Sequence, residues 1–582
     1  MAACNYSLKV NRSLLDPKFE SYRLSLDALP TYNVELDSAV AEVKLRDDQY
    51  TLDHMLAFGM YNYLHCDSWY SDSVYFVDQL GRLLNVTVTL DTVIGKPIEV
   101  FRLPSDINSC DNRLCASMYF CSPTWVAVSD GTGRLFIIKT GKRGNSTAEK
   151  WEIMFNQDLG DPFTVIYSNC YVKSTEHIVE ILLLRVEKDE VDERGSGFHV
   201  SLEWLTVTRK TSDDSEKYVI TEHRLFHGKS VPHYAAVEPE GSGLMIASAK
   251  PFTAIEKDGV PVEENEEHME ENETNDPIYY WQQTSDDVTV TVRLPEGIAK
   301  EDIMFELTPG HIRVGLKGQL SLMEGQLHAS VDHESSTWIL KDGKSIEISL
   351  LKKDDSMWPE LIPGDKKGQF IMDPTQAAEI NEHLMHLTSA ELNSDRDGGP
   401  CNAQEVEECD LGPEDTSCLT RFEGSTMKAT HVVSLASHQY LFTVAVDPAK
   451  MPCFCLRHDV DALLWQPQAD QKENMWDHVA TFNAFGYVQA SKQDKKFTTC
   501  APDYSYAAVC ECLRRVFIYR QPSSLTTVLY NRKEGRHVGQ VAKQQVASLE
   551  TSDPILGFRA TNERLFVLTA KNLFVIKVNL GN

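Results

Sequence analysis

The sequence lacks the long apolar runs that mark membrane proteins. No stretch of about eighteen consecutive apolar residues, the length a bilayer-spanning helix needs, occurs among the 582 residues. The first residues, MAACNYSLKVNRSLLD, also lack an apolar stretch long enough for a signal peptide. We therefore expect a protein that does not insert into membranes and resides in the cytoplasm or also in the nucleus.

Positive charge is scarce. The chain has 56 Lys and Arg residues against 86 Asp and Glu residues, which gives a formal net charge of −30. Proteins that bind nucleic acids through phosphate contacts use Lys and Arg to neutralise the backbone. The composition therefore argues against direct nucleic-acid binding. The hydrophobic fraction of 42% is nevertheless ample for folded cores.

Paired cysteines of the zinc-binding kind are also missing. None of the 14 cysteines forms a Cys-x-x-Cys motif. The two Cys-x-Cys pairs, Cys453/Cys455 and Cys510/Cys512, are flanked by apolar residues, and strand alternation would place each pair on one face of a strand. Two such strands could meet to hold a zinc ion, but we favour reduced, buried cysteines and expect no metal.

The common catalytic motifs are absent as well. We find no Gly-x-Ser-x-Gly, no Gly-x-x-x-x-Gly-Lys-Ser/Thr and no His-Glu-x-x-His. The glycine-rich SDGTGR at 129–134 lacks a following helix that would aim backbone amides at a phosphate, so we interpret it as a hairpin turn. The sequence predicts no catalytic residue, no cofactor site and no metal site, and hence a protein that is not an enzyme.

Two acidic segments divide the chain. Residues 263–276 hold eight carboxylates and no Lys or Arg, and residues 391–424 hold ten carboxylates against two arginines. We interpret both as solvated linkers, with acidic baits for basic partners as the alternative. The predicted organisation is an N-terminal part of a β-propeller (1–262), an acidic linker (263–276), a β-sandwich (277–361), a segment with an amphipathic helix (362–390), an acidic linker (391–424) and a C-terminal part of the propeller (425–582).

The two outer parts show a repeated pattern of apolar strand, polar turn with glycine, and apolar strand. It occurs at 73–88, 124–140 and 233–249, and again at 504–520 and 556–578. Taking Gly81, Gly131 and Gly241 as equivalent gives one period of about 50 residues and then about two, which is typical of β-propeller blades. Four periods before the middle domain and three after it predict one all-β ring of about seven blades. Two independent β-sandwiches are the alternative.

One helix is predicted between the middle domain and the second linker. Asp373 is a good N-cap, and Pro374 falls at the first helical position. Ile380, Leu384 and Leu387 form an apolar stripe. We expect the stripe to pack on a neighbouring domain, with a partner-binding helix as the alternative.

The middle domain has the clearest strand patterns. Apolar and polar residues alternate strictly in three runs, at 288–294, 311–317 and 345–350. This period of two, with one polar face, predicts antiparallel strands packed on a single core. Asp342-Gly343 is a strong hairpin signal. A unit of this size is a two-sheet sandwich.

Several short motifs follow one another in this domain: Tyr280-Trp281-x-Gln283-Thr284, HIRVGLKGQ at 311–319, Gly325-x-Leu327, Glu334-Ser335-Ser336-x-Trp338, Asp342-Gly343-Lys344 and Met357-x-Pro359. In this order they closely resemble the CS domain of the NudC family. The flanks, with two acidic linkers and repeated strands, extend the resemblance over the whole chain.

The resemblance implies a co-chaperone. CS domains are shared by co-factors of the ninety-kilodalton heat-shock chaperone, and NudC relatives are associated with folding of β-propeller clients and with dynein-linked processes. We therefore expect an adaptor that binds that chaperone and a specific client protein. A non-chaperone scaffold in dynein-linked or vesicle trafficking is the alternative. No sustained heptad pattern precedes the domain, so we expect a monomer rather than a coiled-coil dimer.

The candidate functional residues are few. Arg313 and Lys317 share the polar side of one predicted strand, and Lys341 and Lys344 flank a turn. We expect these four residues to form a basic protein-interaction face, with an ordinary solvated face as the alternative. Thr388, just before the second acidic segment, and Ser394 within it are followed by carboxylates and are candidate phosphorylation sites. The tryptophans of the sandwich, Trp281, Trp338 and Trp358, are expected to be packing anchors.

Overall fold

The computed structural model describes residues 4–579 except 17, 18, 20, 91–92, 105–109, 145–150, 190–195, 211–216, 263–278, 285, 295–299, 318–320, 342–344, 354–357, 359, 364, 366, 371–415, 437, 470–474 and 531–536. The chain forms two compact units. One unit contains residues 1–263 and 404–582, and the other contains residues 264–403. The predicted helix at 373–387 lies outside the described residues.

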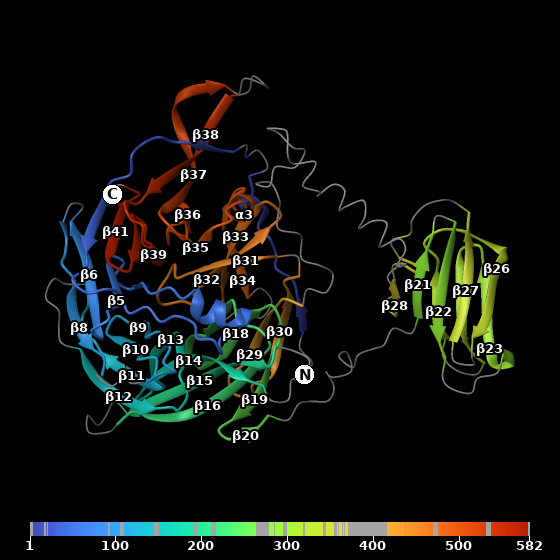
Figure 1. The fold of residues 1–582 in the computed structure, drawn as a ribbon, viewed down its shortest axis with the longest axis horizontal. Coiled ribbons are helices and arrows are strands. Elements are labelled where there is room, and N and C mark those ends of the chain that lie inside the picture. The colour runs from blue at the N-terminus through green and yellow to red at the C-terminus, as the bar shows by residue number, and fades with distance from the viewer. Residues whose placement is uncertain are drawn as a thin grey trace. The chain divides into compact units, whose positions relative to one another are not determined.

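The larger unit is a β-propeller. Its described strands form seven sheets, which are arranged radially around a central axis (Figure 1). The first three sheets follow chain order. They contain β4 (His65–Cys66), β5 (Ser73–Val77), β6 (Arg82–Leu90), β7 (Val93–Ile94) and β8 (Ile98–Arg102); then β9 (Ser117–Ser122), β10 (Trp125–Ser129), β11 (Arg134–Lys139) and β12 (Glu152–Asp158); then β13 (Thr164–Lys173), β14 (Glu176–Lys188), β15 (Phe198–Lys210), β16 (Val219–Gly228), β19 (Phe252–Lys257) and β20 (Val260–Pro261).

The last three sheets come from the C-terminal part of the chain. They contain β31 (Tyr440–Val444), β32 (Cys453–His458), β33 (Asp461–Pro467) and β34 (Trp476–Phe482); then β35 (Lys495–Cys500), β36 (Tyr506–Glu511), β37 (Arg515–Tyr530) and β38 (His537–Ser548), with β2 (Tyr22–Leu24) at the edge; then β39 (Ile555–Ala560), β40 (Arg564–Thr569) and β41 (Asn572–Lys577), with β3 (Thr31–Glu35) at the edge. The prediction of a propeller of about seven blades is confirmed.

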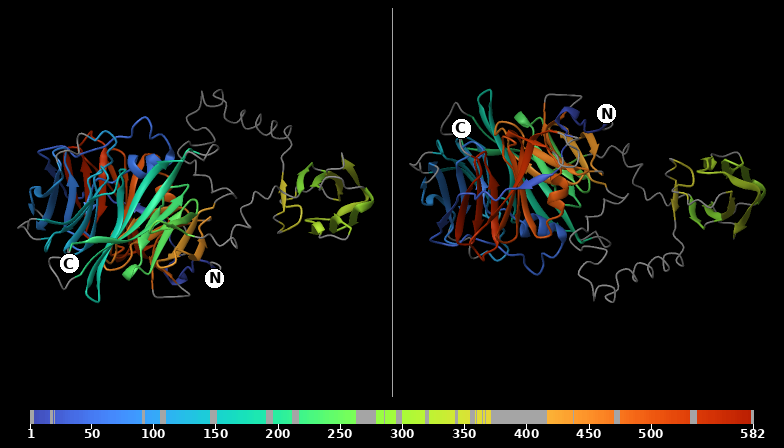
Figure 2. Two further views of the ribbon diagram at one scale, coloured as in Figure 1. Left: turned by 90° about the horizontal axis from the view of Figure 1, so that it is seen from below. Right: turned by 90° about the horizontal axis from the view of Figure 1, so that it is seen from above.

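The fourth blade is built from both parts of the chain. Its strands are, in spatial order, β1 (Cys4–Tyr6), β30 (Ala429–Ser434), β29 (Cys418–Glu423), β18 (Gly243–Ser248) and β17 (Tyr234–Val237). β18 and β29 pair antiparallel, and Figure 2 shows the green strands from before the insertion beside the orange strands from after it. The smaller unit is therefore inserted into one blade of a single ring.

The position of β29 corrects the predicted boundary between linker and propeller. The strand begins at Cys418, inside the segment 391–424 that the charge pattern assigned to a linker. Leu419 and Phe422 are buried, and Arg421 forms an ion pair with Glu238, with 2.6 Å between Nε and Oε1. Five consecutive residues of this strand are buried, Thr420 and Arg421 among them, so the sequence shows no alternation that would mark it as a strand.

The N-terminal segment closes the ring. β3 pairs antiparallel with β41 and completes the last blade. β1 and β2 add parallel to the outer edges of two further blades, beside β30 and β38. Strands from opposite ends of the chain thus share hydrogen bonds, which covers edges that would otherwise be unpaired.

The smaller unit is a two-sheet sandwich. One sheet contains β26 (Val331–Lys341), β27 (Ser345–Lys352), β22 (Asp287–Arg293), β21 (Tyr279–Gln283) and β28 (Gly368–Phe370), and the other contains β23 (Ile303–Thr308), β24 (His311–Leu316) and β25 (Ser321–Gln326). The apolar residues of the three predicted alternating runs are buried, with the exposed fraction at most 9%. These residues are Val288, Val290, Val292, Leu294, Ile312, Val314, Leu316, Ile346, Ile348 and Leu350. The predicted alternating strands are confirmed, but the sandwich extends beyond the predicted end at residue 361, because β28 pairs parallel with β21.

Helical structure is short. The described helices are η1 (Arg12–Leu14), α1 (Leu52–His54), the π-helical turn η2 (Met55–Gly59), η4 (Pro239–Gly241), η6 (Lys300–Asp302) and α3 (Phe485–Ala490). Among these, none has the length and apolar character that a crossing of the bilayer would require.

Candidate protein-interaction sites

Arg313 and Lys317 lie on the three-stranded sheet of the sandwich. Arg313 is directly paired with Glu306 of β23 and Glu324 of β25. Its Nε lies 3.2 Å from Glu324 Oε2 and its Nη1 lies 3.9 Å from Glu306 Oε2. Lys317 follows β24 and is exposed. The row across these three strands is therefore negative, positive, negative.

Lys341 lies on the other sheet. It is at the end of β26, is half exposed, and pairs with Glu347 of β27. Lys344 lies outside the described residues. The structure therefore does not gather the predicted residues into a face of one charge, because carboxylates accompany Arg313 and Lys341. Two-residue alternation placed Arg313 on the polar side of its strand, but it could not show which strands bring acids opposite it.

Two of the three tryptophans of the sandwich are buried anchors, as predicted. Trp281 is 6% exposed and Trp358 is 2% exposed. Gln283 fixes the second of these, because its amide donates to the Trp358 carbonyl at 2.8 Å and its side-chain oxygen accepts from the Trp358 backbone N–H at 2.9 Å. The glutamine of the sequence motif thus ties β21 to the segment after β27.

Trp338 is only partly buried, which differs from the expectation of a simple core anchor. Its ring centroid lies 5.7 Å from that of Phe305, and the Lys300 ammonium lies 5.0 Å from the ring centroid. Aromatic rings that are partly exposed beside a cation are common in protein interfaces. Sequence reasoning missed this cluster because Lys300 precedes β23 and is far from Trp338 in the chain. The two candidate phosphorylation sites, Thr388 and Ser394, lie outside the described residues and stay predictions.

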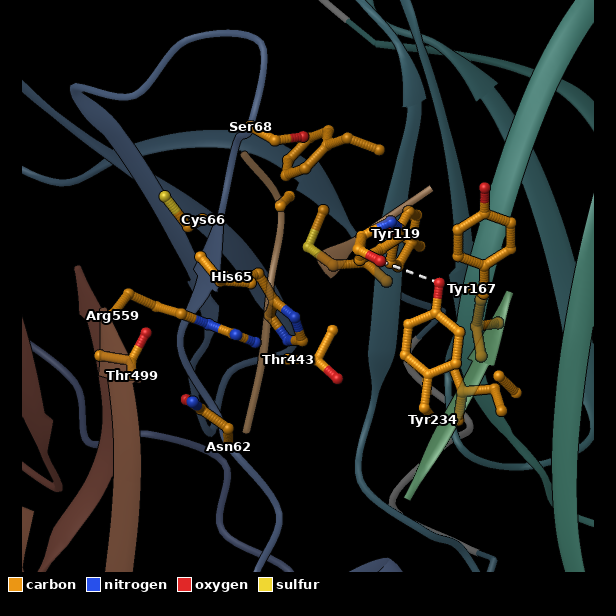
Figure 3. A pocket seen from close by; sticks show the side chains of 18 of the residues that line it. Asn62, His65, Cys66, Ser68, Tyr119, Tyr167, Tyr234, Thr443, Thr499 and Arg559 are labelled. Carbon is orange, nitrogen blue, oxygen red and sulfur yellow. Dashed lines mark hydrogen bonds between the residues drawn. The ribbon is translucent and has the colours of Figure 1, made fainter. Parts of the chain in front are cut away.

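The propeller has a central channel. A cavity of about 620 Å³ is lined by residues of the innermost strand of all seven blades, namely β4, β9, β13, β17, β31, β35 and β39, and of the connections beside them. Figure 3 shows side chains from blades far apart in sequence converging on this space. The sequence did not reveal the site, since its residues belong to no local motif.

Tyrosines line much of the channel, and their hydroxyl groups are bound to backbone carbonyls. Tyr61 donates to Ala116 at 3.2 Å, Tyr167 to Val237 at 3.2 Å, and Tyr234 to Pro452 at 2.9 Å. Burial raises the pKa of all three phenols. The phenols are therefore neutral, and each ties one blade to its surroundings.

Of the two Cys-x-Cys pairs that were predicted to be buried, one is buried at both residues. Cys453 and Cys455 are both fully buried on β32, and burial raises the pKa of both thiols. Cys510 is buried, but Cys512 is exposed because it lies beyond the end of β36. Within the part of the chain that the structure describes, no group of three or more His, Cys, Asp or Glu side chains could hold a metal ion.

Comparisons with known proteins agree with this architecture. Residues 277–352 match the family described as the CS domain. NudC domain-containing protein 1 of Mus musculus is 64% identical over 585 residues, covering 100% of both chains, and its counterpart in Xenopus tropicalis is 61% identical over 583 residues, again covering 100% of both. The nuclear migration protein nudC of Drosophila melanogaster is 32% identical over 82 residues, or 14% of this chain and 25% of that protein. The predicted NudC resemblance is confirmed, and the chain belongs to the family of NudC domain-containing protein 1.

Proposed function

We propose that this protein is a co-chaperone and adaptor, which binds the ninety-kilodalton heat-shock chaperone or its client through the CS sandwich and a specific client through the propeller. The observation that carries the proposal is the insertion of a complete CS domain, with its own core, into a propeller that closes as a single ring. Each unit can bind while the other stays folded.

The physical advantage of this arrangement is a high effective concentration. Two binding units on one chain turn the second contact into an intramolecular event, and this can raise the overall affinity by about 10²–10⁴-fold. A client held by the propeller would thereby be presented to a chaperone held by the sandwich. We also propose that the protein acts as a monomer in the cytoplasm or nucleus and carries out no catalysis.

Affinity purification tests the proposal. The full-length protein is compared with a variant in which residues 277–370, which include every described strand of the sandwich, are replaced by a short glycine–serine linker. We expect the heat-shock chaperone to disappear from the variant, whereas the specific client bound by the propeller is still recovered. A trafficking scaffold that works without chaperones would instead give the same partners, with no chaperone among them, before and after the deletion, and that result would refute the proposal.

A further inference from the structure

Arg559 occupies an unusual position in the propeller channel. It lies on β39, the innermost strand of the last blade, and its side chain extends into the channel toward His65 (Figure 3). The guanidinium Nε donates to the Leu64 carbonyl at 2.8 Å. Within the described ranges, no carboxylate lies at ion-pairing distance from Arg559. A positive charge therefore faces the channel without a neutralising partner.

Three other enclosed arginines of the propeller are neutralised by carboxylates. The N–O distances are 2.6 Å for Arg143–Asp67, 2.6 Å for Arg421–Glu238 and 2.7 Å for Arg564–Asp72. Arg520 has no such ion pair, but its nitrogens donate to Gln545, Asn579 and the Val578 carbonyl. Arg559 shares with Arg520 the lack of an ion pair within the described residues, but Arg559 lines the channel, and in that part of the chain its guanidinium donates to the Leu64 carbonyl alone.

Asp67 lines the channel too, but its carboxylate already forms an ion pair with Arg143. Its Oδ2 lies 2.6 Å from Arg143 Nε and its Oδ1 lies 3.3 Å from Arg143 Nη2. The side chains of both residues are almost fully buried. This pair is neutral as a unit, so Asp67 does not balance Arg559.

The ionisable neighbours of Arg559 are neutral. Burial, with Arg559 as the next cause, lowers the pKa of His65 to about 3, and burial raises the pKa of the Cys66 thiol to about 12. Burial likewise raises the pKa of Tyr61 and Tyr119. At neutral pH this wall of the channel therefore carries one positive charge amid uncharged groups. Arg559 itself is only partly buried, so a ligand that enters the channel can reach its guanidinium.

We propose that the central channel binds a small organic anion, whose carboxylate or phosphate group pairs with the Arg559 guanidinium. The planar guanidinium matches both groups through two parallel N–H donors. Figure 3 shows Thr499 beside Arg559, where its hydroxyl group can add a further hydrogen bond. Thr443 lies farther along the channel, and its hydroxyl is already hydrogen-bonded to Tyr440. The volume of about 620 Å³ is within the range of pockets that hold organic ligands. This proposal is independent of the co-chaperone function.

Thermal unfolding and calorimetry of the full-length protein test the site. The probes are inorganic phosphate, citrate and adenosine monophosphate, each at an ionic strength matched with sodium chloride. We expect at least one probe to raise Tm by about 1–2 °C for each tenfold increase in its concentration above Kd. Citrate alone would indicate a carboxylate ligand, and phosphate with the nucleotide would indicate a phosphate ligand.

Two substitutions at Arg559 and one control complete the test. Arg559→Met should abolish both the binding heat and the Tm shift, and Arg559→Lys should retain a weakened shift. Arg102→Met should behave as the unmutated protein, because Arg102 is exposed and pairs with Glu99 away from the channel. If Arg559→Met does not fold, the comparison rests on Arg559→Lys and on calorimetry of the unmutated protein. Absence of binding for all three anions, or equal shifts in the Arg559 variants and the unmutated protein, would overturn the proposal.

Discussion

His65 shows how the interior of the propeller controls a single side chain. The residue is 8% exposed, and its pKa is lowered to about 3, first by burial and then by Arg559. In an unfolded chain the pKa of histidine is about 6.5. The unfolded state therefore takes up a proton in a pH range where the folded state does not.

The sign of the resulting pH dependence follows from this difference. Stability from neutral His65 is fully present above pH 6.5 and is progressively lost as the pH falls toward 3. Between pH 7 and pH 5.5 we expect a loss of about 1 kcal/mol from this residue alone. His65→Gln should reduce the pH dependence of the unfolding free energy by that amount. An unchanged slope, measured by denaturant unfolding at the two pH values, would show that His65 is not held neutral.

Substitutions of Lys317 and Arg313, on the surface of the sandwich, are expected to affect stability differently. Lys317 is exposed, so Lys317→Glu should change the unfolding free energy by no more than about 0.5 kcal/mol. If the residue contacts a partner, association should slow, with a marked dependence on salt. Arg313→Glu would set three carboxylates side by side with Glu306 and Glu324 and should therefore destabilise the fold as well. Unaltered partner recovery with Lys317→Glu would assign this residue to the solvated surface only.

At the scale of elements, two deletions of N-terminal strands can be compared to test whether β3 closes the ring. Removing residues 1–29 deletes β1 and β2, which lie at the edges of blades that have other strands. Removing residues 1–35 also deletes β3, the fourth strand of the last blade. We expect the longer deletion to cost about 3 kcal/mol or more beyond the shorter one, similar to a large core truncation. Equal melting temperatures for the two deletions would contradict closure by β3.

The sandwich was the part of the fold that the sequence predicted best. Its strands alternate with a period of two, and burial of one face enforces that period. In the propeller the blade count was right, but the assumed equivalence of the glycine turns was only partly right. Gly81 and Gly131 lie between β5 and β6 and between β10 and β11, whereas Gly241 lies in the innermost hairpin of its blade, between β17 and β18. All three have the positive φ angles that the turns were predicted to need, at 72°, 83° and 67°.

The third blade explains why the period was hard to follow. In this blade β14 runs from Glu176 to Lys188 without a turn, and its central residues are all buried. A fully buried strand has no polar alternation, so its pattern does not show where a blade begins. No local pattern pointed to the channel either, because its lining residues come from distant parts of the chain. Arg559, for example, donates a hydrogen bond to the carbonyl of Leu64, which is close to the other end of the chain.

At the scale of the whole molecule, the split blade predicts assembly from fragments. Residues 1–262 carry β18 and β3, and residues 416–582 carry their partners β29 and β41. Expressed together, the two fragments should form one complex that unfolds in a single transition, because each fragment by itself has strand edges without a hydrogen-bonding partner. A shorter fragment, 425–582, lacks β29 and should associate more weakly. Separately soluble fragments that melt independently would argue against a single ring.

The most direct test of the co-chaperone function is the age of the bound partner. Newly made proteins are labelled in a short pulse, and the fraction of each partner bound to this chain is followed during the chase. A co-chaperone should bind its client soon after synthesis and release it as the client matures, so the labelled fraction should rise and then fall. A labelled fraction that rises to a plateau and then persists, as in a permanent complex, would contradict the account.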